Sequence, residues 1–314
     1  MRSWTLIVLV ACACVGKAPA TAAKTTTTIT KTPEVPARPV CITPSEDAAT
    51  IGHASSDGAQ VQYCIGETDC FAVDLGSGTY HRLVEPPKRA APRARVEAIT
   101  PKLDICTGRT CTALAAKVMP SAAAMRAATN ADGTFAVVLL GDAPKGAGYA
   151  EVWNVAKSKR TATFRYARGD FRCGEVAMLD NTIYLSAAQC GQPAARAGLY
   201  ALNGRRIANV GGKDFGSFGS AYVQVDGATW AFLEENANQL VLQDVVKGKV
   251  WKTIDTSSLF EAGGAKMGTP GESALVRLSD GRIIVIAGSP ATGTIATIDI
   301  GTGEVTVMPP PLCK

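Results

Sequence analysis

The chain has 314 residues, of which 46% are hydrophobic and 19% charged, so it is too apolar and too weakly charged for a disordered protein. Its 31 glycines and 17 prolines follow no period of three, which excludes collagen. Its two histidines, His53 and His81, exclude a site built from three or more histidines. The formal net charge is +5, but residues 1–40 hold five basic groups and one acidic group, which leaves 27 basic and 26 acidic groups in the rest. A nearly neutral region gives no counterion-release argument for nucleic acid, and we expect no nucleic acid partner.

Residues 1–20 have the pattern of a secretory signal. Arg2 supplies the positive start, Trp4 to Gly16 is an apolar stretch too short to span a bilayer comfortably, and Ala18-Pro19-Ala20 supplies small residues for cleavage. A second interpretation stays open: Leu9-Val10-Ala11-Cys12 resembles the bacterial lipobox, in which the cysteine, here Cys12, is lipidated. Residues 21–40, rich in Thr, Ala, Pro and Lys, are expected to form a flexible tether. We therefore expect an exported protein in the periplasm, on the outer surface or outside the cell.

Eight cysteines remain after the signal, an even number that suits an oxidising compartment. They are Cys41, Cys64, Cys70, Cys106, Cys111, Cys173, Cys190 and Cys313. The short spacings of Cys64/Cys70 and Cys106/Cys111 enclose turn-like residues, which fits bridges that pin hairpins. A zinc site is the alternative, but the first spacing is too wide for a zinc knuckle and no histidine is near either pair. We expect structural disulfides and no metal.

A repeat appears in the turns. Asp-Gly or Asp-Asn pairs, which favour tight hairpin turns, precede apolar runs at Asp57-Gly58, Asp132-Gly133, Asp180-Asn181, Asp226-Gly227 and Asp280-Gly281. The last unit predicts four antiparallel strands, with the Ile283–Ile286 strand apolar throughout and expected to be buried on both faces. Similar units start near Ala48, Met125, Glu175 and Ala221, and a compressed one covers Val96–Met119 with Pro101-Lys102 as its first turn.

Six units over residues 41–314 give about 46 residues each, within the range of propeller blades. No convincing helix is predicted, and Ser121–Ala128 is interpreted as a connector followed by a strand. Meanders of this length predict an all-β fold, a six-bladed β-propeller of four-stranded antiparallel blades. Seven blades, paired β-sandwiches and a β-solenoid are the alternatives.

This repeated order of strands, turns and loops resembles the repeats of secreted bacterial β-propeller proteins. The resemblance covers residues 41–314, is generic and carries over no catalytic motif. It implies that the first strand of each blade lines a central channel, and that the 2–3 loops and 4–1 connectors share one face. It also implies that Cys173 pairs with Cys190 across one hairpin, and that Cys41 pairs with Cys313 to close the ring.

Candidate ligand-binding residues fall in loops on that implied face. They are Asp214, Phe215, Phe218, Glu234, Glu235 and Asn236, because aromatic rings beside acids and amides suit a sugar or peptide. Ordinary loop composition explains them equally well. His53 falls in a first strand near the channel, as a ligand-binding residue or as a hydrogen-bonded structural histidine. His81 is expected on the surface, and the basic run Lys88–Arg95 is expected to be a solvated connector or a contact for an acidic partner or lipid head groups.

The sequence lacks a G-x-S-x-G elbow, a P-loop, an H-E-x-x-H motif and a G-x-G-x-x-G loop. We therefore expect a non-catalytic binding or scaffold module that is a monomer, has no cofactor, and takes a protein, peptide or glycan as partner. A membrane is expected to be contacted only through a lipid anchor. The alternative is a propeller hydrolase or lyase that uses carboxylates in the channel with His53.

Overall fold

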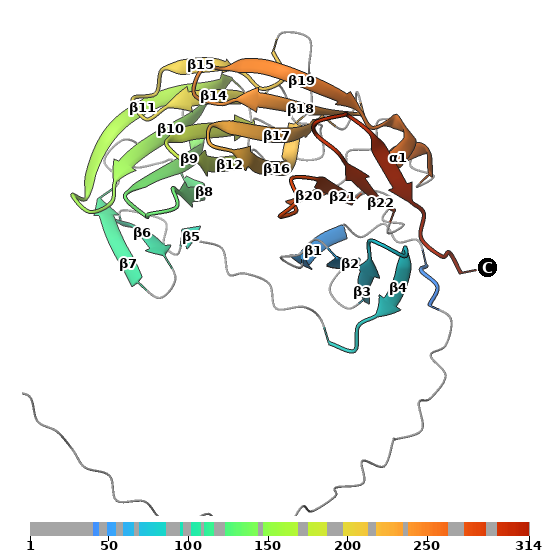
Figure 1. Cartoon of the computed structure of the whole chain (residues 1–314). Helices are drawn as coiled ribbons and strands as arrows, with labels where there is room; N and C mark the ends of the chain where they lie inside the picture. Colours follow the sequence, from blue (N-terminus) through green and yellow to red (C-terminus); the bar gives the residue numbers. More distant parts are fainter. Residues whose placement is uncertain are drawn as a thin grey trace, which may run out of the picture. The chain divides into compact units, whose positions relative to one another are not determined.

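Antiparallel strands joined by short turns make up nearly all the regular structure in the computed structural model (Figure 1). The chain divides into two units, Met1–Arg38 and Pro39–Lys314, and every described residue lies in the second. The structure describes residues 40–43, 49–54, 59–65, 69–85, 95–96, 102–107, 110–115, 123–143, 147–168, 175–186, 197–212, 218–234, 238–262, 273–286 and 294–313. These residues form five four-stranded sheets and one three-stranded sheet, all antiparallel.

Strands pair with their neighbours in chain order within each sheet. The first sheet contains β1 (Ala49–Ala54), β2 (Gln60–Ile65), β3 (Asp69–Asp74) and β4 (Thr79–Arg82). The three-stranded sheet contains β5 (Arg95–Val96), β6 (Lys102–Thr107) and β7 (Thr110–Ala115). The next sheet contains β8 (Ala123–Thr129), β9 (Phe135–Ala143), β10 (Ala147–Asn154) and β11 (Lys159–Arg168).

The remaining three sheets repeat the same meander. One contains β12 (Glu175–Leu179), β13 (Thr182–Ser186), β14 (Gly198–Ala201) and β15 (Arg206–Asn209). The next contains β16 (Phe218–Asp226), β17 (Thr229–Glu234), β18 (Gln239–Asp244) and β19 (Lys249–Asp255), followed by helix α1 (Ser257–Ala262). The last contains β20 (Ala274–Arg277), β21 (Ile283–Ile286), β22 (Ile295–Ile298) and β23 (Val305–Met308).

The strand pattern read from the sequence is confirmed in outline, with three corrections. Ile283–Ile286 is fully buried, as expected, and β8 begins inside the run that was interpreted as connector plus strand. The unit at Val96–Met119, however, has three described strands, and Lys102 begins β6 instead of forming a turn. Arg95, expected in the connector, lies in β5. Helix α1 was not expected; the Asp255 carboxylate accepts the Ser257 amide at 2.9 Å and so starts its first turn.

A second turn motif, between the third and fourth strands, was missed in the sequence. Asp74 accepts backbone amides from Gly76 and Ser77, each at 2.9 Å. Asp244 does the same for Val246 and Lys247, at 3.0 and 2.8 Å. Asp299 accepts the Thr302 amide and Asn154 the Lys157 amide, at 2.8 and 3.0 Å. An Asp or Asn at this position therefore satisfies amides that the tight turn leaves outside the strand ladder.

Successive sheets pack through buried apolar side chains. First strands contact one another in the order β5, β8, β12, β16, β20 and β1, so the first sheet follows the last one. One cluster joins Val61, Phe71 and Val73 of the first sheet to Ile284 and Ile286 of the last sheet. The described strands leave this series open between the β1–β4 and β5–β7 sheets. The predicted closed ring of six blades is therefore not seen among them.

The third-to-fourth strand turns of the β12–β15 and β16–β19 sheets also pack onto the outermost strand of the sheet before them. A Cβ added at Gly248 would lie 2.6 Å from the Ala208 Cβ, and one at Gly204 would lie 2.6 Å from the Phe164 ring. Both glycines have positive φ, 73° and 82°, a conformation that other residues adopt only with strain. These turns therefore need glycine for two reasons, the backbone conformation and the close approach of the neighbouring strand.

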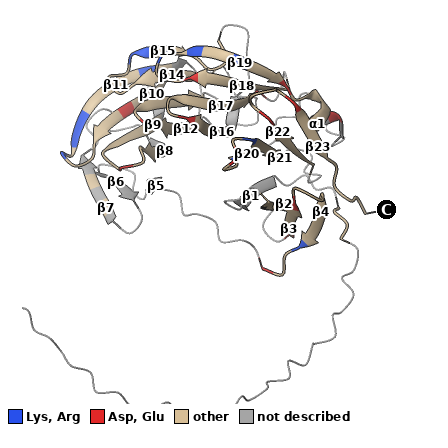
Figure 2. Ribbon diagram, viewed as in Figure 1, with Lys and Arg blue, Asp and Glu red and all other residues tan. Residues whose placement is uncertain are grey.

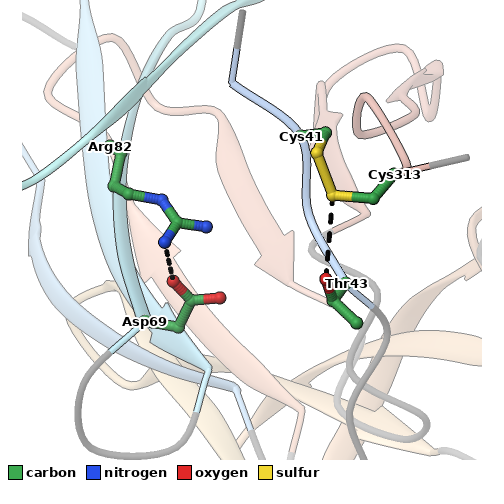
Figure 3. Close-up of a disulfide and its surroundings, with 5 residues drawn as sticks. All are labelled: Cys41, Thr43, Asp69, Arg82 and Cys313. Atoms are coloured by element: carbon green, nitrogen blue, oxygen red, sulfur yellow. Dashed lines mark hydrogen bonds and ion pairs between the residues drawn. A yellow bond between two sulfur atoms is a disulfide. The ribbon is translucent and has the colours of Figure 1, made fainter. Parts of the chain in front are cut away.

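A disulfide joins the two ends of the described chain (Figure 3). Cys41 and Cys313 are bonded across a sequence separation of 272. Ile42 between them is fully buried and forms a parallel bridge to Leu312. Its amide donates to the Pro311 carbonyl at 2.7 Å, and its carbonyl accepts the Cys313 amide at 3.1 Å. We call this contact between residues 41–43 and 311–313 the seam, because it holds the first and last sheets together.

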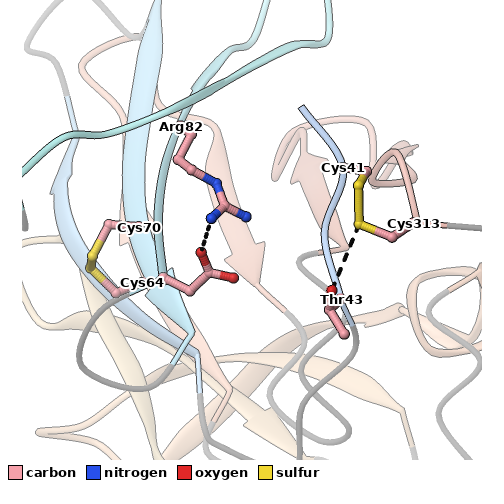
Figure 4. A network of polar contacts seen from close by, with 7 residues as sticks. Cys41, Thr43, Cys64, Cys70, Arg82 and Cys313 are labelled. Carbon is pink, nitrogen blue, oxygen red and sulfur yellow. Dashed lines mark hydrogen bonds and ion pairs between the residues drawn. A yellow bond between two sulfur atoms is a disulfide. The ribbon is translucent and has the colours of Figure 1, made fainter. Parts of the chain in front are cut away.

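The second described disulfide, Cys64–Cys70, lies within the first sheet (Figure 4). The two cysteines are cross-strand partners of β2 and β3. Cys111 is also disulfide-bonded, and the register places the backbone of Cys106 opposite it. The structure thus contains Cys41–Cys313 and Cys64–Cys70, two of the four predicted pairs. Cys173 and Cys190 lie outside the described residues.

Candidate functional site

Two of the predicted binding residues meet at one end of the β16–β19 sheet. Phe218 is the first residue of β16, Glu234 is the last residue of β17, and the two are paired in the register. Both are therefore strand residues and not the loop residues that the sequence predicted. The Glu234 side chain is 1% exposed. Asp214, Phe215, Glu235 and Asn236 lie outside the described residues.

The pairing continues across the whole sheet. Glu234 pairs with Gln239 at the start of β18, and Gln239 pairs with Asp255 at the end of β19. Phe218, Glu234, Gln239 and Asp255 thus form a single cross-strand row, which we call the end row. Directly paired residues point to the same side of a sheet, so the end row brings the Glu234 and Gln239 side chains to one side.

Buried polar residues lie next to the end row, one position before Gln239 and one position after Asp255. Asn238 is 3% exposed, has φ of 50° and accepts the Thr256 amide at 2.7 Å through its carbonyl. Thr256 is fully buried, and its carbonyl accepts the Leu259 amide at 3.0 Å. This arrangement joins the β17–β18 hairpin to the start of α1, and it fixes the positions of the polar side chains at this end of the sheet.

Two oxygens in this group have no hydrogen-bond partner, Gln239 Oε1 and Thr256 Oγ1. Buried polar atoms without partners are rare in folded proteins, and each is a place where a water or a ligand group is expected. Asp255 differs, because the Ser257 hydroxyl and the Ser257 amide hold the pKa of its carboxyl below the usual range. The end row and the adjoining Thr256 therefore bring a buried glutamate side chain together with an amide oxygen and a hydroxyl that have capacity to bind.

A second polar contact joins the first strands of two consecutive sheets, β8 and β12. Arg126 of β8 and Glu175 of β12 form an ion pair, and the Ser186 hydroxyl accepts the Glu175 amide at 3.1 Å. Burial, together with the Glu175 carboxylate, raises the pKa of Tyr222 in β16 to about 12. Sequence reasoning missed Glu175, although an acidic residue at the start of an otherwise apolar first strand was a readable signal.

The two histidines lie in the first sheet. His53 is in β1, where its backbone is opposite Gln62, and it belongs to a different sheet from the end row. His81 lies in β4 and is exposed, as predicted. Arg95 is the only member of the basic run Lys88–Arg95 among the described residues. Within the described ranges, no group of three or more His, Cys, Asp and Glu side chains could hold a metal ion.

Comparison with known proteins gives no family for this chain. No protein-family description matches the sequence, and no curated protein matches it. One similar solved structure is that of the computationally designed Ika8 protein. It has a TM-score of 0.41 and 13% sequence identity, and the match covers 85% of this chain and 75% of that chain.

The disulfides bear on the compartment. Structural disulfides persist in oxidising compartments and are rare where thiols are kept reduced, so the fold is that of a β-rich protein suited to an exported location. Among the described residues, no helix is long and apolar enough to cross a membrane.

Proposed function

We propose that the chain is an exported, disulfide-stapled six-bladed β-propeller that binds a protein, peptide or glycan through the end row of the β16–β19 sheet. Five sheets with one meander topology and first strands in a single order support the propeller. The packing of the first sheet on the last supports ring closure. A crystal structure with the β5–β7 sheet remote from the β1–β4 sheet would contradict the ring.

The observation that carries the binding role is the set of buried polar groups at the end row. Binding sites combine apolar surroundings with a few convergent polar groups that fix the ligand. Glu234 supplies a buried acid, while Gln239 Oε1 and Thr256 Oγ1 are buried without partners. Peptide amides and sugar hydroxyls donate hydrogen bonds to such oxygens, so either ligand class would satisfy them.

Binding to peptide and glycan arrays tests this role. The wild-type chain is compared with Thr256→Val, which keeps the shape of the side chain and removes the hydroxyl, and with Glu234→Gln. Each is expected to weaken binding of the captured ligand by about tenfold, the usual effect of losing one buried hydrogen bond to a ligand. Asp226→Asn is the matched control, because Asp226 ends β16 at the opposite end of the same sheet and is exposed.

The outcomes are distinct. Binding that the control also reduces would point to a general charge effect, and binding that survives both end-row variants would exclude this site. If neither array captures the chain, the binding role itself is wrong. Thermal unfolding of each variant separates lost binding from lost folding.

Export is the other part of the proposal. Cleavage after Ala20 leaves Thr21 as the first residue, whereas lipidation leaves modified Cys12 there. The intact mass of the native protein distinguishes the two, and a mass that retains Met1 in envelope fractions would contradict both.

A further inference from the structure

Basic side chains gather on the outermost strands of three consecutive sheets. Figure 2 shows Lys and Arg along β11, β15 and β19. Residues 155–168, 203–209 and 245–255, which cover these strands and the turns before them, contain one acidic residue, Asp255 at the end of β19. The corresponding segments of the first and last sheets differ, since residues 75–83 contain one arginine and residues 300–308 contain no basic residue. The near-neutral net charge of residues 41–314 therefore conceals a local basic surface.

Packing between sheets makes this surface continuous. The β14–β15 turn meets β11, because a Cβ at Gly204 would contact the Phe164 ring. The β18–β19 turn meets β15, because a Cβ at Gly248 would contact Ala208 and Ile207. The exposed basic residues of the three strands and their turns form what we call the outer basic face. They are Lys157, Lys159, Arg165, Arg205, Arg206, Lys247 and Lys249.

Two large apolar side chains are exposed in the same region. Val246, in the β18–β19 turn, is 62% exposed, and Trp251, in β19, is 49% exposed. Trp251 has no partner in the β18–β19 register, which passes from Leu242–Lys252 to Gln243–Val250. It is therefore the extra residue of a β-bulge, a feature that turns a side chain away from the regular strand direction.

We propose that the outer basic face binds the surface of a bilayer that contains anionic phospholipid, with Trp251 and Val246 entering the headgroup region. Lysines near an anionic surface each add to binding through the phosphate charge. Tryptophan is enriched at the membrane–water interface, because its ring is apolar and its N–H is polar. This contact is separate from the end row and does not depend on the proposed ligand site.

The basic charges of this face, taken alone, have two simpler explanations. Lysines on an outermost strand prevent another strand from adding to the sheet edge, which accounts for Lys159 on β11. A soluble polyanion would bind the same charges. Neither accounts for a half-exposed tryptophan and an exposed valine among the lysines, whereas a lipid surface offers both of them an apolar environment.

Vesicle binding tests the proposal with the chain Thr21–Lys314, so that the tether and its charges are the same in every arm. The chain is expected to sediment with vesicles of phosphatidylglycerol and phosphatidylcholine, not with phosphatidylcholine alone, and to be released by salt. Lys159→Gln with Lys249→Gln is expected to weaken binding about 25-fold, at roughly fivefold for each lysine. Arg82→Gln with Arg277→Gln is the matched control, because it makes the same change in net charge on the first and last sheets, and it is expected to leave binding unchanged.

Trp251→Ser separates a lipid surface from a soluble polyanion. We expect it to weaken vesicle binding about tenfold through the loss of apolar contact, while heparin binding stays the same. Equal loss in the matched control would overturn the assignment of the face. Vesicle binding that is unchanged by Trp251→Ser, with tighter binding to heparin, would replace the lipid by a soluble polyanion. No sedimentation with the anionic vesicles at low salt would overturn the proposal altogether.

Discussion

Interfaces between consecutive sheets differ from the seam in how they are held. In the β12–β15/β16–β19 interface, the β18–β19 turn packs on β15, and the fully buried Gln243 side chain crosses between the sheets. Gln243 accepts the Gly211 amide and donates to the Asn209 and Gly248 carbonyls, each at 3.0 Å. The two sheets are consecutive in the sequence, so the chain already connects them and noncovalent contacts are enough to hold them together.

The seam joins parts of the chain that are far apart in sequence. A glycine turn is present here too, but a Cβ added at Gly78 in the β3–β4 turn would meet nothing within 4 Å. In its place are the Cys41–Cys313 bond, the Ile42–Leu312 bridge and a hydrogen bond from the Tyr80 hydroxyl to the Met308 carbonyl at 3.1 Å. This contrast indicates that a covalent bond holds the first and last sheets together because the chain does not connect them directly. The entropy of loop closure is largest for such a contact between distant parts of the chain.

Removing the seam disulfide is the largest expected effect. Cys41→Ala with Cys313→Ala opens a loop of separation 272, and the entropy relation gives about 6 kcal/mol of lost stability. Cys64→Ala with Cys70→Ala opens a loop of separation 6, and the same relation gives about 2 kcal/mol. Denaturant unfolding measures both. Equal losses would mean that the seam disulfide does not act by restraining the unfolded chain.

Gly248→Ala is expected to break a consecutive interface. Its φ of 73° costs about 1 kcal/mol for alanine, and the new Cβ would lie 2.6 Å from the Ala208 Cβ, which adds about 2 kcal/mol of overpacking. Gly281→Ala is the matched control, because Gly281 has φ of 91° but no atom within 4 Å of the added Cβ. It should lose only the backbone cost. Thermal unfolding that gives the same shift for both would deny the close approach of turn and strand.

Removing a polar contact at each kind of interface is expected to give a smaller difference in the free energy of unfolding. Gln243→Met keeps the volume and leaves the Gly211 amide and two carbonyls without their partner, so we expect a loss of about 2 kcal/mol. Tyr80→Phe removes one hydrogen bond at the first–last interface and is expected to cost about 1 kcal/mol. Urea unfolding of both variants measures the difference. A larger loss for Tyr80→Phe than for Gln243→Met would show that the first–last interface depends on its polar contact more than the consecutive interface does.

Local chemistry explains why much of the fold could be read from the sequence. Asp-Gly or Asp-Asn pairs mark the first turn in five of the six units, because these residues adopt the positive φ that the turn requires, as Gly281 and Asp180 show. The Cys64–Cys70 pair followed from a spacing of a few residues. The Asp/Asn turn motif at Asp74, Asp244 and Asp299 was equally local and was missed, because its side-chain bonds to amides two or three residues ahead leave no dipeptide signature.

Nonlocal packing explains what could not be read. Glu234 was expected in an exposed loop, but β17 extends to this residue and the sheet buries it. The outer basic face was hidden in a net charge near zero, since only the packing of turns on neighbouring strands brings Lys159, Arg206 and Lys249 onto one surface. Trp251 lies at a bulge that depends on the register of β18 and β19, and the sequence of a single strand does not specify a register.

The smallest expected effect distinguishes charge from hydrogen bonding in the third-to-fourth strand turns. The Lys247 amide, with the Val246 amide and the Lys247 ammonium, holds the pKa of the Asp244 carboxyl below its usual value of 3.8. A carboxyl whose pKa is lower in the folded state stabilises the fold above its unfolded pKa, and this contribution is lost as the pH falls through the folded value. Asn154 occupies the same turn position in the β8–β11 sheet and accepts the Lys157 amide without charge.

Asp244→Asn is therefore expected to keep stability at neutral pH nearly unchanged and to make the loss of stability below pH 3.8 shallower. Asn154→Asp, the reverse change, should make that acid loss steeper, because its new carboxylate would accept the Lys157 amide. Unfolding midpoints measured from neutral to acid pH test the pair, and parallel pH profiles for both variants and the wild type would show that these turns depend on the shape of the acceptor and not on its charge.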